Sequence, residues 1–240
     1  MGYMKLKIPV DLVTINCNMV EEGIKALEYS TKYIEFNNVF LLSDQTISGN
    51  FDLISIKKIR DVEDYNNEIL NLSKHIKSEY VLIIQHDGHV INHKKWDDLF
   101  LKFDYIGAPW PNSNKWNERW KYYPKEMEEK ILKNLNLNRI GNGGFSLRSK
   151  KFIDYSRSYK EVDGAPEDIF LNILNYDKAF EYGIKYPDVK TAISFSYEIP
   201  LKGKKLEKEK RFHFYNKNNH FGWHGNKFIN SNKLLNLKNN

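Results

Sequence analysis

Apolar and polar positions follow two different periods in the first hundred residues. Runs of consecutive apolar residues, many of them β-branched, are separated by stretches in which apolar residues recur every three or four positions. The first pattern predicts buried strands and the second predicts amphipathic helices. The expected strands are residues 10–15, 39–42, 52–59 and 80–84, and the expected helices carry the stripes Val20-Ile24-Leu27-Thr31 and Tyr65-Ile69-Leu72-Ile76. This alternation predicts an α/β fold with a mostly parallel, doubly wound central sheet and helices on both faces.

The second half of the chain is less regular. Its expected strands are residues 104–108, 144–148, 192–197 and 211–215, and its expected helices are 126–137, 150–158 and 166–180, the last with Asp163 as a possible cap. Residues 111–124 are polar and rich in Trp, and we expect a loop there. We therefore predict one domain over residues 1–226, with a regular half at about 8–100, a smaller irregular half at about 101–226, and a Lys- and Asn-rich tail at 227–240.

Composition restricts the class of partner. The formal net charge of +6 mildly favours anionic partners such as nucleotide phosphates. No run of basic residues alternates with aromatic residues as a nucleic-acid-binding strip would, so no nucleic-acid partner is expected. The densest basic segment, residues 202–211, also contains Glu207 and Glu209, and a solvated loop explains it.

Cysteine use and hydropathy predict a location. Cys17 is the single cysteine, which excludes an intrachain disulfide and favours a reducing compartment. No stretch approaches the ~20 apolar residues of a membrane span, and the N-terminus lacks the apolar core of a signal peptide. We expect a cytoplasmic protein, with peripheral membrane association as the alternative, and the sequence indicates no particular oligomeric state.

Polar residues follow the expected strands at their carboxyl ends, where an open parallel sheet binds its ligands. They are Asn16, Asp44, Asp61 and the run Gln85-His86-Asp87-Gly88-His89. The buried strand before the run delivers Asp87 between two imidazoles. Carboxylate and imidazole together suit Mn²⁺ or a similar cation that bridges a diphosphate. A turn capped by Asp87 with two solvated histidines explains the same run equally well.

A glycine run and an acidic pair are the next candidates. Gly141-Asn142-Gly143-Gly144 precedes a strand rather than a helix, so a sugar packed on bare backbone, or an ordinary tight turn, explains it better than a phosphate loop. Glu167 and Asp168 begin the expected helix at 166–180. There they complement the helix dipole, which is a sufficient structural reason, but one of them could also act as a general base.

A Trp-His pair near the end of the chain is the last candidate. Phe221-Gly222-Trp223-His224-Gly225 places the two side chains between glycines. An indole can stack on a sugar face, and an imidazole can reach a metal ion or a phosphate. His213 and His220 compete with His224 for that second role.

Four blocks occur in order along the chain, and their combination resembles a known family. The blocks are Tyr80–Val90 (YVLIIQHDGHV), Asp104–Trp110 (DYIGAPW), Gly141–Arg148 (GNGGFSLR) with Glu167–Phe170 (EDIF), and Phe221–Gly225 (FGWHG). Together they resemble a group of microbial and viral GT-A-type glycosyltransferase domains, most of them classed as domains of unknown function. The resemblance covers roughly residues 8–226, and it is specific as a combination although each block alone is weak.

The resemblance implies a metal site at the tip of a central strand. GT-A domains carry a DxD-type motif there, in a nucleotide-binding half that corresponds to residues 8–100. Gln85-His86-Asp87 occupies that place, so Asp87 matches the metal-binding acid, whereas Gln85 departs from the first acid of the motif. His224 matches a C-terminal histidine that completes such sites. Mn²⁺ or Mg²⁺ is the implied cofactor. Because Gln85 replaces the first acid of the motif, the resemblance does not imply that the enzyme strictly requires this ion.

The resemblance also implies a reaction. A Gly-Gly strand followed by a Glu-Asp helix is similar to the acceptor side of inverting galactosyltransferases. Asp168 would be the catalytic base and Glu167 a contact to the donor sugar, and the two roles could be exchanged. The implied activity is transfer of a sugar from a nucleotide-sugar donor, UDP-linked by family analogy, to a glycan or other hydroxyl acceptor with inversion of configuration.

Further residues are assigned to the substrates on the same basis. Lys57 and Arg148 are candidates for diphosphate contacts, and Trp110, Trp116 and Trp120 for an acceptor platform or lid. The full set of residues assigned to the nucleotide sugar is Asn16, Asp44, Lys57, Gln85, His86, Asp87, Gly143 and Gly144.

Two rival functions remain open at this point. A nucleotidyltransferase would normally carry a Gly-rich loop with Arg or Lys after the first strand, and Asn16-Cys17-Asn18 does not provide one. A catalytically weak or inactive GT-A-like module that binds nucleotides or glycans is the second rival, and the substitution at Gln85 favours it.

Overall fold

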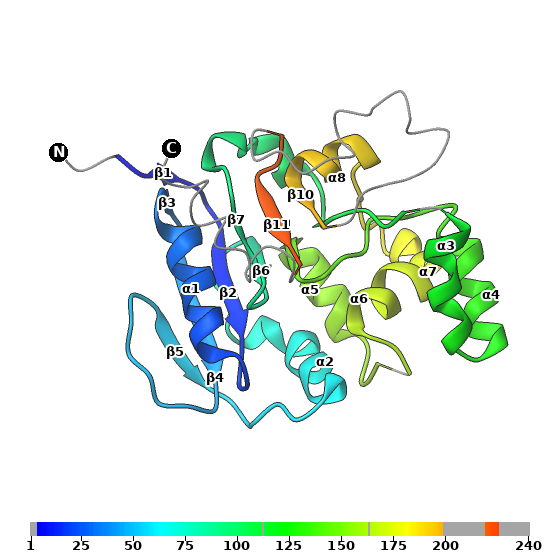
Figure 1. Cartoon of the computed structure of the whole chain (residues 1–240), viewed down its shortest axis with the longest axis horizontal. Helices are drawn as coiled ribbons and strands as arrows, with labels where there is room; N and C mark the ends of the chain where they lie inside the picture. The colour runs from blue at the N-terminus through cyan, green and yellow to red at the C-terminus, as the bar shows by residue number, and fades with distance from the viewer. Residues whose placement is uncertain (1–3, 112, 163, 199–218, 226–240) are drawn as a thin grey trace.

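A six-stranded sheet organises the chain (Figure 1). The computed structural model describes residues 4–111, 113–162, 164–198 and 219–225. The strand order is β5-β4-β2-β6-β9-β8, in which β5, β4, β2 and β6 are parallel and β9 is antiparallel to both of its neighbours. The strands are β2 (Asp11–Ile15), β4 (Asn38–Ser43), β5 (Asp52–Ser55), β6 (Tyr80–Ile84), β8 (Tyr105–Ile106) and β9 (Phe145–Ser149). The predicted mostly parallel sheet is confirmed.

Helices pack on both faces of this sheet, as predicted. The α-helices are α1 (Val20–Thr31), α2 (Val62–Leu70), α3 (Asn114–Asn117), α4 (Lys125–Asn134), α5 (Lys150–Arg157), α6 (Glu167–Ile169), α7 (Tyr176–Glu181) and α8 (Val189–Phe195). Successive residues of a strand point to opposite faces. Leu12 therefore packs in one core cluster with Leu27 of α1, whereas its neighbour Val13 packs in another with Ile69 of α2 and Ile153 of α5.

Short helical turns complete the helical content. The 3-10 segments are η1 (Leu72–Lys74), η2 (His93–Lys95), η3 (Asp98–Lys102) and η4 (Glu118–Tyr122), and η5 (Phe170–Leu174) is π-helical. The segment at 111–124 is thus helical over α3 and η4, not the loop expected from its polar composition. Trp120 explains the difference, because its ring is buried in a cluster with Trp110 and the helices that follow.

A small second sheet brings the end of the described chain to the tip of β6. It contains β10 (Ser196–Tyr197), β11 (Gly222–His224) and β7 (Gly88–Val90), in which β11 is antiparallel to β7 and parallel to β10 (Figure 1). A separate parallel pair joins β1 (Leu6–Lys7) to β3 (Ile34–Glu35). Because β7 begins only four residues after β6 ends, residues near position 224 lie beside the candidate strand tip.

One further element prediction is wrong, and another is confirmed only with an interruption. The strand expected at 192–197 is helix α8 up to Phe195, because the Asp188 side chain accepts a hydrogen bond from Thr191 N and caps a helix there. The helix expected at 166–180 is interrupted by the π-helical segment between α6 and α7. The expected cap Asp163, the strand at 211–215, the loop at 202–211 and the tail lie outside the described residues.

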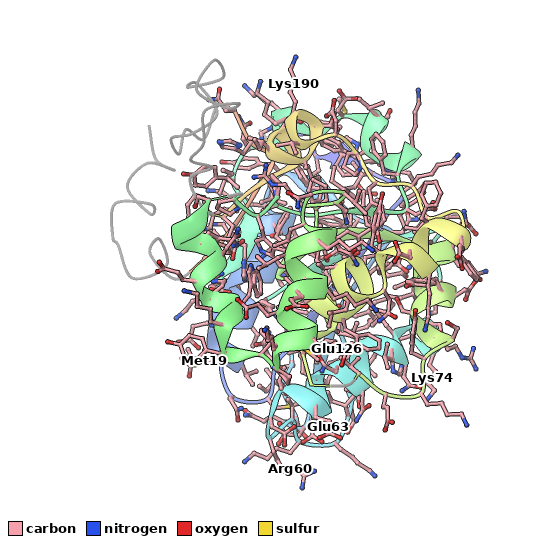
Figure 2. All side chains as sticks on the ribbon, turned by 90° about the vertical axis from the view of Figure 1, so that its right-hand side faces the viewer. Met19, Arg60, Glu63, Lys74, Glu126 and Lys190 are labelled. Carbon is pink, nitrogen blue, oxygen red and sulfur yellow. The ribbon has the colours of Figure 1, made fainter. Side chains whose placement is uncertain are left out.

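Charged side chains project from the outside of the molecule. Arg60 and Glu63 lie at one end in Figure 2, and Lys190 of α8 lies at the opposite end; all three are exposed. Cys17 is buried. Among the described residues, no helix combines the length and the apolar character that crossing a membrane requires.

Candidate functional site

A cavity of about 440 Å³ opens where Gln85 follows β6. Its walls come from α2, η4, the segment before β9, the start of α6, and residues next to β10 and β11. Gln85, Glu167, Asp168 and His224 all line it. The sequence-predicted strand tip, acidic pair and C-terminal histidine therefore meet at one cavity, although they are more than fifty residues apart along the chain.

His224 contacts the strand tip directly. Its Nε2 atom lies 3.2 Å from Oδ1 of Asp87 and 3.2 Å from Oε1 of Gln85. The β7–β11 ladder sets this geometry, because it pairs His224 with Gly88, the residue after Asp87. Asp87 is only 6% exposed and reaches the cavity through the imidazole. Tyr65 of α2 lines the same cavity as Gln85.

The other side of the His224 ring faces two groups that we had not singled out. Nδ1 lies 3.0 Å from the amide nitrogen of Asn142 and 3.6 Å from Oε1 of Glu198. Burial disfavours a charged imidazole, but the neighbouring carboxylates of Asp87 and Glu198 raise the pKa of His224 to about 10. Burial opposes the charge of Asp87 as well, yet its hydrogen bond with His224 keeps the pKa of that carboxyl below its usual value.

Glu167 forms a buried ion pair with Arg148. The Arg148 guanidinium donates to both carboxylate oxygens, at 2.8 and 3.1 Å, and its Nε donates to the hydroxyl of Ser146 at 3.1 Å. Arg148 is 0% exposed, so the expectation that it contacts a diphosphate is wrong. A guanidinium buried in the interior needs a partner to offset its desolvation, and Glu167 supplies the charge.

Asp168 faces the cavity from the first turn of α6. Its Oδ2 accepts a hydrogen bond from Gly143 N at 3.0 Å, and its Oδ1 accepts one from Ile169 N at 2.8 Å. Burial and the neighbouring charge of Glu167 nevertheless raise the pKa of Asp168 to about 7. A carboxylate with a pKa in this range is suited to accept a proton near neutral pH.

An asparagine from another helix holds the start of α6. The residue before the helix is Pro166, which offers no side-chain cap. Asn66 of α2 replaces that cap, because its Oδ1 accepts from Glu167 N at 2.9 Å while its Nδ2 donates to the Ala165 carbonyl at 3.1 Å. Asn66 is buried and lines the cavity, so it ties the position of the acidic pair to α2.

The glycine run allows the side chains of the site to approach the backbone. A Cβ atom on Gly144 would overlap the imidazole of His224, and one on Gly143 would lie 2.7 Å from Oε1 of Glu167. The space beside these glycines is thus filled by side chains of the protein itself. Substitution at either position would displace a group that lines the cavity.

The remaining predicted residues lie outside this cavity. Asn16, Asp44 and Lys57 follow β2, β4 and β5 at the same edge of the sheet, but they do not line it, and neither does His86. The side chain of Asn16 donates to Thr14 Oγ1.

Of the competing groups near the end of the chain, His220 is buried against the carbonyl of Ile193, and His213 lies outside the described residues. Trp110 and Trp120 form part of the cavity wall, whereas Trp116 does not.

Among the lining residues that sequence reasoning did not assign to the site are Asn66, Arg119, Asn142 and Glu198. Arg119 stacks on Trp116, with its guanidinium carbon 3.3 Å from the ring centroid. Of these residues, only Asn142 could have been identified from the sequence, because it stands inside the glycine run. Asn66 and Glu198 act through partners distant in sequence, so no local pattern identifies them.

The residues around His224 Nε2 can be tested as ligands of a divalent cation. No group of three or more His, Cys, Asp or Glu side chains in the described part of the chain is arranged to hold a metal ion. Gln85 nevertheless adds an amide oxygen to Asp87 and His224, and buried Oδ1 of Asp87 faces the imidazole at 3.2 Å. Ligands about 2.1 Å from an ion at right angles lie about 3 Å apart, close to the 3.2 Å spacings here. The two spacings from His224 therefore suit a shared cation, provided that the imidazole is neutral.

Comparison with known proteins identifies the family. The profile of the family described as "Protein of unknown function (DUF5672)" matches residues 50–224. This chain belongs to the DUF5672 family. The match contains the strand tip, the acidic pair and His224. No curated protein sequence matches the chain.

Solved structures show what fold this DUF5672 chain has. A crystal structure of an active-site mutant of LgtC matches with a TM-score of 0.52 and 13% identity, over 96% of this chain and 95% of that chain. The galactosyltransferase LgtC in complex with donor and acceptor sugar analogues gives 0.47 and 13%, over 90% and 86%. The mannosyltransferase PcManGT from Pyrobaculum calidifontis, in complex with GDP-Man and Mn²⁺, gives 0.41 and 11%, over 75% and 55%. The LgtC similarity and the sheet order establish a GT-A-like fold.

Proposed function

We propose that this chain is a glycosyltransferase that moves a sugar from a nucleotide-sugar donor to a hydroxyl group of a glycan or other acceptor. The observation that carries the proposal is Asp168, a carboxylate with a pKa of about 7 that lines a cavity on a GT-A-like fold. His224 lines the same cavity and joins it to Asp87 at the strand tip. Direct displacement at a sugar carbon requires a base that takes the proton of the acceptor hydroxyl and polar groups that stabilise the leaving diphosphate. Asp168 would serve as the base, and the strand tip would provide the polar groups.

Asp168 acts as the general base in this proposal. The acceptor hydroxyl loses its proton to the carboxylate as its oxygen attacks the anomeric carbon of the donor sugar. The bond between that carbon and the diphosphate oxygen breaks with its electron pair, so a nucleoside diphosphate leaves and the configuration is inverted. Hydrogen bonds from Gly143 N and Ile169 N hold the carboxylate in place during the attack.

Glu167 and Arg148 influence the pKa of the proposed base, Asp168. Because Arg148 occupies both oxygens of Glu167, this carboxylate acts through its charge rather than as the sugar contact that we expected. The charge disfavours ionisation of Asp168 and makes it a stronger proton acceptor. The base is therefore assigned to Asp168 and not to its neighbour.

The donor would lie along the carboxyl edge of the sheet. Asn16, Asp44 and Lys57 follow three adjacent parallel strands and are proposed for the nucleotide, with uridine as the base. A divalent cation held by Asp87, His224 and Gln85 would neutralise charge on the leaving diphosphate. His224 must give up its proton to take that role, and Asn142 and Glu198 orient its ring.

A non-catalytic binding module is the second candidate. It is favoured by one observation, which is that the strand tip presents neutral Gln85 beside Asp87 and so has a single carboxylate for a cation. Such a module would bind a nucleotide sugar without turning it over.

Release of nucleoside diphosphate from a panel of nucleotide sugars separates the candidates. The wild-type chain would be incubated with each donor, with and without Mn²⁺, and with mixed methyl glycosides as acceptors. We expect release from at least one uridine-linked donor, stimulated by Mn²⁺. Binding without release, seen as a thermal shift, would favour the module, since a ligand at about a hundred times its Kd stabilises a protein by ~2.7 kcal/mol. Production of pyrophosphate from a nucleoside triphosphate would instead indicate a nucleotidyltransferase.

A further inference from the structure

One wall of the cavity is aromatic and takes no part in the transfer step described above. Trp110 and Trp120 lie with ring centroids 6.0 Å apart, and Tyr123 follows 6.2 Å from Trp120. All three line the cavity, and both indoles are otherwise buried. Flat aromatic surfaces of this kind pack well against the C–H groups of a sugar ring.

Two residues that line the cavity each contain a buried polar atom with no hydrogen-bond partner among the described residues. Trp120 is 3% exposed, and its Nε1 has no hydrogen-bond partner among the described residues. Asn142 is 4% exposed. Its Nδ2 lies 3.0 Å from Nδ1 of His224, and its Oδ1 has no hydrogen-bond partner among the described residues. Buried donors and acceptors are rarely left unpaired, because each costs about 1–3 kcal/mol.

The chemistry of these unpaired groups indicates the ligand. An indole N–H donates only, and the free half of a neutral amide offers one further hydrogen bond. A sugar hydroxyl can both accept and donate, so neighbouring hydroxyls on one ring satisfy both groups at once. Both groups are neutral, so they match a neutral hydroxyl better than a phosphate, which requires cations or several N–H donors.

We propose that Trp110, Trp120 and Asn142 form the subsite for the sugar ring of the acceptor, with a ring hydroxyl accepting a hydrogen bond from Nε1 of Trp120. The assignment to the acceptor rests on the proposed function, in which Asp168 receives the acceptor proton. The sugar-binding chemistry itself does not depend on turnover.

The subsite is close to the proposed base. Asn142 precedes Gly143, whose N–H donates to Asp168. On the aromatic side, burial and the charge of Asp168 raise the pKa of Tyr123, which packs against Trp120. A ring held against this wall therefore lies within reach of the carboxylate.

Indole N–H resonances provide a direct test. The chain contains five Trp residues, so a ¹⁵N-labelled sample gives five indole signals. The variants Trp120→Phe and Trp116→Phe assign two of them by deletion. Trp116 is the matched control, because its Nε1 is also buried and unpartnered among the described residues, yet it does not line the cavity. The probes are methyl glycosides of glucose, galactose, mannose, N-acetylglucosamine, rhamnose and glucuronic acid, titrated with and without uridine diphosphate and Mn²⁺.

The expected result is a saturable shift of the Trp120 signal with at least one glycoside, while the Trp116 signal stays in place. The Trp120→Phe variant should bind that glycoside about fivefold to tenfold more weakly, because it loses one hydrogen bond but keeps a ring. The subsite is overturned if no glycoside moves the Trp120 signal, or if Trp120→Phe binds as tightly as wild type. Donor release measured separately distinguishes the two failures. Release without glycoside binding removes the subsite only, whereas glycoside binding without any release removes the transferase.

Discussion

The guanidinium of Arg148 and the carboxylate of Glu167 form a doubly hydrogen-bonded pair in the interior, with N–O distances of 2.8 and 3.1 Å. Arg148 comes from β9 and Glu167 from the start of α6, so the pair ties the sheet to the helix that carries Asp168. It also fixes a negative charge next to Asp168, and that charge together with burial raises the pKa of the proposed base to about 7.

Neutralising Glu167 should move the acidic limb of the pH–rate profile. In Glu167→Gln the charge next to Asp168 is lost and Arg148 is left in excess, and both changes lower the pKa of Asp168. Because the base must be deprotonated to act, we expect the limb to shift to lower pH by about one unit or more. Initial rates of nucleotide release between pH 5 and 9 measure the shift.

The exposed Glu126, labelled in Figure 2, provides the control for this shift. Glu126→Gln removes the same charge from the outside of α4 and should leave the limb where it is. Unfolding in urea must accompany both variants, since breaking a buried ion pair costs about 3–5 kcal/mol. A folded Glu167→Gln protein with the wild-type limb would contradict the role given to Glu167.

Removing the acid at position 168 should change how stability depends on pH. The pKa of Asp168 is about 7 in the folded chain against an ordinary value of 3.8. The folded state therefore holds the proton more tightly, and wild type loses stability as the pH rises from about 4 to 7. Asp168→Asn lacks this loss, so its stability relative to wild type should increase over that range and then level off.

Urea midpoints at half-unit pH steps measure this difference. The exposed Asp154 of α5 provides a control, because Asp154→Asn removes an acid that is not in the cavity and should show a flat difference. A flat difference for Asp168→Asn as well would mean that the carboxyl titrates at its ordinary pKa.

Gly144 should not tolerate a side chain. Alanine there places a methyl group against the His224 imidazole, which must then turn away from Asp87 and Gln85. Displacement of a site group by about 1 Å can cost roughly 100-fold in rate, so we expect a loss of that order in nucleotide release. The imidazole resonance of His224 should move in the same variant. Wild-type activity in Gly144→Ala would remove His224 from the site.

Asn66 should affect the rate of transfer because it helps to position Asp168. Asn66→Ala deletes the cap of α6 and should cost about 0.5–2 kcal/mol of stability. Because the acidic pair loses its anchor, kcat should fall while the KM for the donor changes little. Asn67→Ala on the exposed side of the same helix is the matched control and should retain both parameters. Equal losses in kcat for the two variants would indicate a general effect of α2 rather than a specific cap.

The sheet and the main cluster of the site could be predicted from the sequence for identifiable reasons. A central parallel strand is apolar on both faces, and Tyr80–Ile84 shows that pattern without interruption. Ligands bind at the carboxyl ends of such strands, which directed attention to Asp87. The acidic pair and His224 were candidates from their own residue types, and the resemblance then assigned them to the same site as the strand tip, a link that no periodicity provides.

The rest depended on contacts that are distant in sequence. Arg148 was expected to contact a diphosphate, because charged residues are almost never fully buried without a partner, and its partner Glu167 is on another element. Asn66 contacts a backbone group 101 residues away. The strand expected at 192–197 failed because Ile193, Phe195 and Tyr197 alternate with serines, a period that suits a strand, whereas Asp188 starts a helix just before them.

The most direct measurement compares turnover and binding in Asp168→Asn and wild type. Nucleoside diphosphate release and donor affinity would be measured on the same preparations at pH 8, where Asp168 is ionised in wild type. The account predicts that the variant binds the nucleotide sugar with wild-type affinity and loses at least about 100-fold in turnover, as expected for a lost general base. Undiminished turnover in Asp168→Asn would contradict the assignment of Asp168 as the base and, with it, the proposed mechanism.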